Sequence, residues 1–357
     1  MKSNPYRLLN DHAFWKRSIA KLPAHEVDPV VDFPQLINRD TKVATAGSCF
    51  AQHIARRLSK SGFNYYVPEN GHEIFDPETL TTYNYGTFSA RYGNLYTARQ
   101  LFQLFQRAFG LFSPIEPAWR ASDGSYRDPF RPNIQPGGFE SEASMLLDRA
   151  THLQLVRKMF ETTDVFVFTM GLTECWRSKV DGVVFPICPG VEGGEYNSED
   201  YEFYNQTVED VVNDMSQFIS LLTGVNPKVK VILTVSPVPL MATARNDAHV
   251  LSATTYSKSV LRVSAESVTN KFDNVFYFPS YEIITGNFNR GQYYAEDLRS
   301  VLEVGVDHVM GLFFKYATDA DSPQIEEQKA ESIDTSLKVR PSVADVECDE
   351  ELLDRDI

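Results

Sequence analysis

Two side chains that can act as nucleophiles stand side by side early in the sequence, at Ser48 and Cys49. A short run of β-forming residues, Val43 to Thr45, leads through Gly47 to this pair. Apolar residues then follow at helical spacing: Phe50, Ile54 and Leu58. This pattern predicts a strand, a tight turn and the start of a helix. Because the first N–H groups of a helix have no partner within it and carry partial positive charge, such a junction favours a thiolate, an alkoxide or an oxyanion.

The composition is that of a folded protein that acts on a small or neutral substrate. The chain has 357 residues, of which 43% are hydrophobic, enough to bury one large core or two modest ones. The net charge of −14 and the pI near 5.0 exclude nucleic acid and an anionic membrane as main partners, because either would require a basic face. We therefore expect a small-molecule or carbohydrate substrate, and the oligomeric state stays open.

Cysteine usage and the N-terminal sequence bear on cofactors and on location. Four cysteines are too few for a disulfide framework, and no Cys-x-x-Cys pair indicates zinc. We expect neither a metal nor another cofactor. The N-terminal residues lack the apolar core of a secretory signal, and no run reaches the length of a membrane span. These features predict a cytoplasmic protein.

Strand-like and helix-like patterns alternate along the chain. Apolar runs of strand length occur at residues 43–47, 63–67, 164–171, 228–240 and 274–280. Helical periodicity occurs at residues 98–109, 141–160, 205–223, 256–271 and 300–316, the last opening with a capping box of Ser300 and Glu303. This alternation predicts an α/β fold, a three-layer α/β/α sandwich with a mainly parallel, flavodoxin-like sheet. In that architecture a ligand binds at the carboxyl ends of the strands.

The remaining segments predict the domain organisation. Residues 1–40, with scattered prolines, predict an extended arm laid over a single domain that spans residues 41–317. Within this domain, residues 113–140 form a Pro/Gly-rich insertion, interpreted as a wall or lid over the site rather than a sheet element. Residues 318–357 lack periodicity and are strongly acidic, which predicts a disordered tail.

Several ordered motifs resemble those of one known family. They are AGSCFA, YNYGTFSARYGN, MGLTECW, SPVPL, YSKSVLR and YFPSYEI. Together they resemble the GSCFA family, within the SGNH or GDSL-type hydrolase superfamily, over roughly residues 40–315. The resemblance implies a flavodoxin-like α/β/α domain and ester hydrolysis or acyl transfer, often on carbohydrates.

The resemblance assigns roles by register. It puts Cys49 at the position of the superfamily's nucleophilic serine, with Ser48 as the alternative nucleophile. If neither residue is catalytic, Cys49 is a small packed residue and Ser48 an N-cap. Gly86, with Gly93 as a competitor, matches the glycine that donates an N–H to the oxyanion. Gly171 matches the next block, in which Thr173 replaces the asparagine that completes the oxyanion hole.

The general base is the largest departure from the superfamily pattern. Asp-x-x-His becomes the stretch from Asp297 to Ser300, so a serine stands where the histidine belongs. His249 is the first substitute, in a loop expected at the active edge. His308, on the last helix, is the second, and His53, four residues after Cys49, is the third.

Four further residues are candidates for substrate binding. Glu174 could accept hydrogen bonds from sugar hydroxyls, and Trp176 could stack on a sugar ring. Lys258 and Arg262, four residues apart on one helical face, could anchor a carboxylate or phosphate, although a solvated face or pairing with the acidic excess is the favoured explanation.

These observations predict an acyl-transfer enzyme, an esterase or O-acyltransferase, that acts on a polysaccharide or glycoconjugate precursor. The alternative is a catalytically lapsed domain that binds a glycan or a partner protein, which the missing asparagine and histidine favour. A nucleotide-binding protein is disfavoured because no glycine-rich phosphate loop follows any predicted strand.

Overall fold

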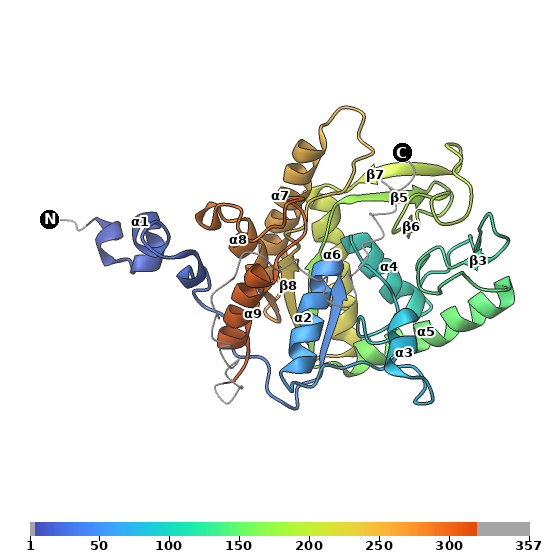
Figure 1. Ribbon diagram of the computed structural model, residues 1–357, viewed down its shortest axis with the longest axis horizontal. Helices are drawn as coiled ribbons and strands as arrows, with labels where there is room; N and C mark the ends of the chain where they lie inside the picture. Colours follow the sequence, from blue (N-terminus) through green and yellow to red (C-terminus); the bar gives the residue numbers. More distant parts are fainter. Residues whose placement is uncertain (1–3, 320–357) are drawn as a thin grey trace, which may run out of the picture.

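A four-stranded parallel sheet forms the centre of the computed structural model, which describes residues 4–319 (Figure 1). Its strands lie in the order β1 (Val43–Gly47), β4 (Val165–Met170), β8 (Lys230–Val235) and β9 (Val275–Tyr277). The strand predicted at residues 63–67 is reduced to one parallel bridge between Tyr65 and Val43. With this bridge counted, the order is the flavodoxin-like 2-1-3-4-5.

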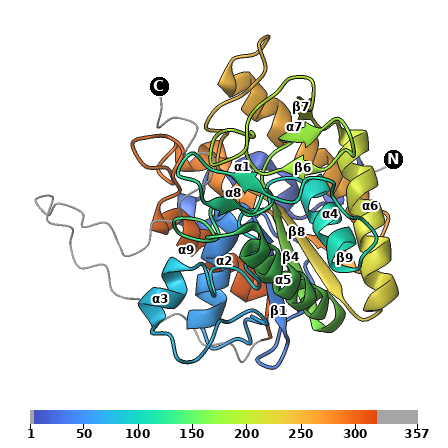
Figure 2. The same ribbon diagram turned by 90° about the vertical axis from the view of Figure 1, so that its right-hand side faces the viewer.

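Helices cover both faces of this sheet, so the predicted α/β/α architecture is confirmed. In β4, Phe166 and Phe168 face one layer, whereas Val165 and Val167 face the other. The first layer contains α4 (Ala98–Ala108), α5 (Glu142–Thr162), α6 (Val208–Val225) and α7 (Val250–Thr269); Figure 2 shows α4 and α5 in front of the strands. The second contains α2 (Cys49–Lys60), α8 (Ser280–Thr285) and α9 (Glu303–Ala317). Burial on both faces explains why the strands are continuous apolar runs.

Three predicted helix starts are wrong. Helix α6 begins at Val208, because Asn205, its predicted start, is the last residue of a strand. Helix α9 begins at Glu303 with Leu302 as its N-cap, and no side chain caps it. The predicted capping box fails because Ser300 donates both its N–H and its hydroxyl to the carboxylate of Asp297, which closes a tight turn instead. Helix α7 begins at Val250, six residues before the predicted start, and His249 is its N-cap.

Two antiparallel sheets were not predicted. Between β4 and α6, the strands β5 (Glu174–Ser178), β6 (Val184–Phe185) and β7 (Tyr201–Asn205) pair in the order β6-β5-β7. The insertion at residues 113–140 contains the pair β2 (Trp119–Arg120) and β3 (Tyr126–Arg127), which corrects the expectation that it holds no sheet element. Trp119 is buried and packs against Phe185 with ring centroids 5.2 Å apart, so the insertion rests on the neighbouring antiparallel sheet.

The N-terminal region is not a simple extended arm. It contains four short helices, η1 (Pro5–Leu8), η2 (Asp11–Ala13), α1 (Trp15–Ser18) and η3 (Ala24–Glu26), the first of which project from one side of the body in Figure 1. Further along, Ile37 is buried and pairs with Thr318, which is also buried, so the body continues past the predicted boundary at residue 317. The rest of the predicted acidic tail and Cys348 lie outside the described residues.

Two further short helices occur among residues 4–319. Helix α3 (Pro77–Thr82) follows the loop after Tyr65, and η4 (Asn287–Asn289) follows α8. Among residues 4–319, no helix combines the length and the apolar character needed to cross a membrane.

A buried cluster of ion pairs joins the insertion to α5. The carboxylate of Asp128, which is 1% exposed, accepts from Arg131 at 2.8 Å and from Arg149 at 2.7 Å. Asp148 accepts from Arg131 at 2.7 Å and from Arg91 at 2.9 Å. Burial alone would raise the pKa of Asp128, but the two arginines outweigh it and hold this pKa well below its usual range.

Replacing Asp128 tests this cluster. Asp128→Asn should lower the free energy of unfolding by about 3 to 5 kcal/mol at neutral pH, because Arg131 and Arg149 would remain buried without their shared carboxylate. Because the folded-state pKa of Asp128 is lowered, its contribution is complete above the unfolded pKa near 4 and declines as the pH falls below it. Urea unfolding at pH 7 and at about pH 3 should therefore show a smaller difference between wild type and variant at the lower pH. Glu140→Gln, an exposed change in the same insertion, is the control; a loss under about 1 kcal/mol for Asp128→Asn at pH 7 would contradict the prediction.

Candidate active site

The turn after β1 requires glycine at position 47. Gly47 has φ +144°, and a Cβ at this position would lie 2.4 Å from the carbonyl oxygen of Thr169 on the neighbouring strand β4. No other residue fits so close an approach. The turn therefore places the next two residues directly at the carboxyl edge of the sheet.

Ser48 and Cys49 differ in their access to solvent. Ser48 is the N-cap of α2 and only 3% exposed; its side chain caps no N–H, and its buried hydroxyl makes no hydrogen bond to any residue between 4 and 319. Cys49, the first residue of α2, is partly exposed and forms no disulfide. The cysteine is thus the nucleophile candidate that a substrate can reach.

The segment 92–97 lies across the ends of β1 and β4. The N–H of Leu95 donates to the Gly47 carbonyl at 2.9 Å, and the Tyr96 carbonyl accepts from the N–H groups of Gly171 at 2.9 Å and Leu172 at 3.0 Å. Asn94, next to Leu95, is buried. In this YGN stretch only the glycine was singled out from the sequence, so Asn94, which is buried next to the residue that bonds Gly47, was missed.

The predicted oxyanion donors are not brought together. A Cβ on Gly171 would lie 3.1 Å from the Ser48 Cβ, so this glycine adjoins the turn formed by residues 47–49, here named the nucleophile turn. Its N–H, however, donates to the Tyr96 carbonyl. Thr173 is fully buried, and its hydroxyl donates to the Asn205 side chain at 2.6 Å. Gly86 is exposed with φ +76°, and a Cβ added to it would have no atom within 4 Å, which is the geometry of a turn glycine; Gly93 with φ +69° is similar.

Lys258 is buried beside the nucleophile turn. It is 2% exposed, and its ammonium donates to the Gly171 carbonyl at 2.6 Å. This corrects the expectation that it shares an outward face with Arg262. Arg262 pairs with Glu282 at 2.7 Å and with Glu266 at 2.9 Å. Its charge is therefore used in ion pairs within the protein.

The candidate bases lie in different surroundings. His249 is exposed, and its Nδ1 accepts the N–H of Leu251 at 3.1 Å. The Nδ1 of His308 is 2.9 Å from the Tyr293 hydroxyl, and burial lowers the pKa of this histidine. Burial, with the charge of Arg56 acting the same way, lowers the pKa of His53 to about 4. Asp297 is exposed and closes its own turn, as described above.

A family comparison accounts for the motifs at this edge. The model of the GSCFA family matches residues 42–313, a span that includes β1, the nucleophile turn and most of α9. The chain belongs to the GSCFA family. No protein with curated function matches it. Among solved structures, the crystal structure of an acetyl esterase variant with an acetate ion is similar, with 10% identity and a TM-score of 0.31, over 76% of this chain and 93% of that one.

In this GSCFA protein, the two residues predicted to bind a sugar, Glu174 and Trp176, lie on β5. Glu174 accepts from the Thr243 hydroxyl at 2.7 Å, and burial raises the pKa of its carboxyl. Trp176 packs against Tyr196 and Phe203, with ring centroids 5.3 and 5.9 Å away. Both side chains are half-buried and point to the same face of β5, because alternate residues of a strand share a face. In the described part of this GSCFA chain, no cluster of three or more His, Cys, Asp or Glu residues could hold a metal ion.

The Gly47 turn can be tested by a single methyl group. Gly47→Ala should lower the free energy of unfolding by about 2 to 5 kcal/mol, because it adds both a contact with Thr169 and an unfavourable φ. Gly86→Ala is the matched control: it has a positive φ but open space, so it should cost only about 1 to 2 kcal/mol. Chemical denaturation of both variants makes the comparison, and equal losses would show that the approach to Thr169 does not matter.

Proposed function

We propose that this GSCFA protein is an acyl-transfer enzyme, an esterase or O-acyltransferase, that uses Cys49 to act on a polysaccharide or glycoconjugate precursor. The supporting observation is the position of Cys49: it is the partly exposed first residue of α2, at the carboxyl edge of a parallel sheet. A helix N-terminus lowers the pKa of a thiol and so favours the reactive thiolate.

The proposed reaction has two steps. The Cys49 thiolate attacks the acyl carbonyl carbon and forms a C–S bond; the ester C–O bond then breaks, and the leaving sugar oxygen takes a proton. Water or a second sugar hydroxyl next attacks the thioester, loses its proton and releases the thiolate. The N-terminal turn of α2 and the Asn94 amide are the candidates to stabilise the oxyanion, in place of Gly86, Gly171 and Thr173.

Lys258, rather than a histidine, is the proposed proton donor and acceptor. It contacts Gly171, which adjoins Ser48, so a buried cation lies next to the nucleophile turn. Lysine seldom occurs fully buried in proteins, and buried lysines serve as general bases in other enzymes. His249, which caps α7, and His308, which contacts the Tyr293 hydroxyl, remain secondary proposals.

Cysteine labelling tests the nucleophile. At neutral pH, iodoacetamide should alkylate Cys49 at least about tenfold faster than Cys188, which is also partly exposed but whose pKa burial raises to about 11. The fast phase should vanish in Cys49→Ala and persist in Ser48→Ala, with labelled peptides located by mass spectrometry. A fluorophosphonate adduct on Ser48 would instead identify the serine as nucleophile, and equal rates at both cysteines would contradict the covalent mechanism.

Substitution of Lys258 tests its charge. Lys258→Met should shift the pH midpoint of Cys49 alkylation upward by about one unit or more, because removing a nearby cation disfavours the thiolate. Lys258→Arg keeps the charge and should recover part of the shift. Thermal unfolding of both variants checks that they fold. An unchanged midpoint in a folded Lys258→Met protein would contradict the proposed role.

A second candidate function is a catalytically lapsed domain that binds a glycan or a partner protein. The observation in its favour is that the Gly171 N–H and the Thr173 hydroxyl both donate within the protein. Slow labelling of both Ser48 and Cys49 would favour this function over catalysis.

A further inference from the structure

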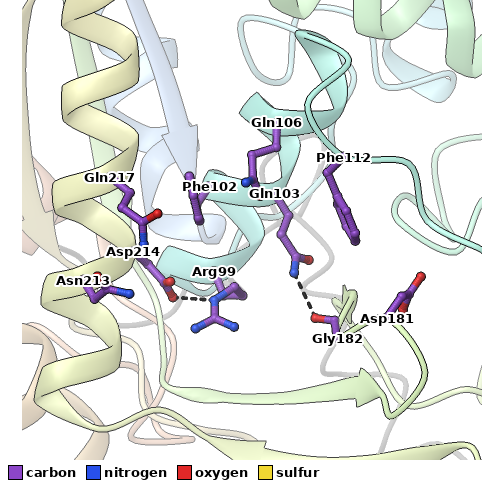
Figure 3. Close-up of a pocket in the computed structure, with 10 residues that line it drawn as sticks. All are labelled: Arg99, Phe102, Gln103, Gln106, Phe112, Asp181, Gly182, Asn213, Asp214 and Gln217. Atoms are coloured by element: carbon purple, nitrogen blue, oxygen red, sulfur yellow. Dashed lines mark hydrogen bonds and ion pairs between the residues drawn. The ribbon is translucent and has the colours of Figure 1, made fainter.

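A cavity of about 330 Å³ lies between α4, α6 and the turn that joins β5 to β6. Figure 3 shows Asn213, Asp214 and Gln217 of α6 on one side, and Phe112 and Asp181 on the other, with side chains of α4 between them. The volume is at the small end of the range for ligand pockets, about 300 to 1,000 Å³.

Part of the cavity wall is held rigidly by internal hydrogen bonds. Asp214 is buried and accepts from Arg99 Nε at 2.7 Å and from the Gln206 amide at 2.8 Å. The Gln103 amide donates to the Gly182 carbonyl and accepts from the Val184 N–H, both at 2.9 Å. These bonds fix α4 against both the hairpin and α6, so the cavity is preformed.

Other lining groups are available to a ligand. The two terminal nitrogens of Arg99 and the carboxamides of Gln106, Asn213 and Gln217 make no side-chain hydrogen bond to any described residue. Figure 3 shows these groups arranged around the same space. Each carboxamide both donates and accepts, as a sugar hydroxyl also does.

The charges of the lining favour a neutral ligand. Arg99 is paired with Asp214, and Asp181 adds a second carboxylate, so a phosphate or carboxylate would meet more negative than positive charge. An apolar ligand would leave the Arg99 nitrogens and the amides without partners, which is costly. A neutral polyhydroxylated ring carries no charge and offers hydroxyls to these polar groups, and its apolar face can pack on Phe112.

Two elements of the cavity wall are joined through the backbone to segments that adjoin the turn at residues 47–49. Arg99 lies in the first turn of α4, directly after the segment that contacts Gly47 and Gly171. On the other side, Gln206, which holds Asp214, donates its N–H to the Thr173 carbonyl at 2.9 Å. We infer that this cavity binds one neutral sugar residue of the carbohydrate chain whose acyl group is transferred, an inference that rests on the proposed function.

Glycan binding by an inactive variant tests the inference. The full-length Cys49→Ala protein would be applied to a printed array of neutral and acidic oligosaccharides, and the strongest neutral binder measured by calorimetry. Adding Asn213→Ala and Gln217→Ala, both at exposed positions of α6, should weaken binding about tenfold or more, because hydrogen bonds to the ligand are lost. Ser220→Ala, exposed on the same helix but outside the cavity, should leave binding unchanged.

The outcomes separate this inference from the proposed function. If Cys49 is not labelled rapidly but a glycan binds in a way that depends on Asn213 and Gln217, the proposed enzyme function is overturned and the sugar site is kept. If Cys49 labels normally, three results would overturn the sugar site alone. These are that no neutral glycan binds, that acidic glycans are preferred, or that the double substitution leaves binding unaffected. Gln106→Ala, on the opposite helix, provides an independent second variant.

Discussion

The site depends on one set of backbone hydrogen bonds, through which residues 95 and 96 join the ends of β1 and β4. Leu95 donates to Gly47, and Tyr96 accepts from both Gly171 and Leu172. The bonds hold the nucleophile turn against the next strand at the point where Gly47 leaves no space for a side chain. The position of this edge is therefore set by backbone groups, which every residue type carries.

Polar interactions fix both ends of this bridging segment. Before it, Arg91 donates its N–H to Glu69 and its guanidinium to Asp148, within the buried ion cluster. After it, Thr97 and Gln100 form a capping box that starts α4. Buried polar networks demand a defined geometry, because a displaced partner leaves a charge or a donor without compensation. The active edge is thus positioned by directional bonds in addition to apolar packing.

The sequence predicts the central sheet because strands buried on both faces are continuous apolar runs, and it predicts the nucleophile turn because Gly47, Ser48 and Cys49 precede a clear helical stripe. It does not predict β5 and β7, since these strands are largely half-buried and mix aromatic with charged residues without strict alternation, and β6 is buried but only two residues long. Nor does it reveal that Lys258 is buried, because a lysine on an amphipathic helix normally faces solvent. The supposed cap at Ser300 fails for a different reason: the sequence shows both Asp297 and Glu303 near Ser300, but it does not decide between a local turn closed by Asp297 and a helix start.

The antiparallel strands β5, β6 and β7 leave the α/β core and return to it at nearly one point. Gln206, just before α6, donates its N–H to the carbonyl of Thr173, just before β5. A segment whose ends meet can be lengthened, shortened or exchanged with little effect on the elements that flank it. Changes in the length of the loops within this excursion should therefore leave the junction of Thr173 and Gln206, and with it the start of α6, in place.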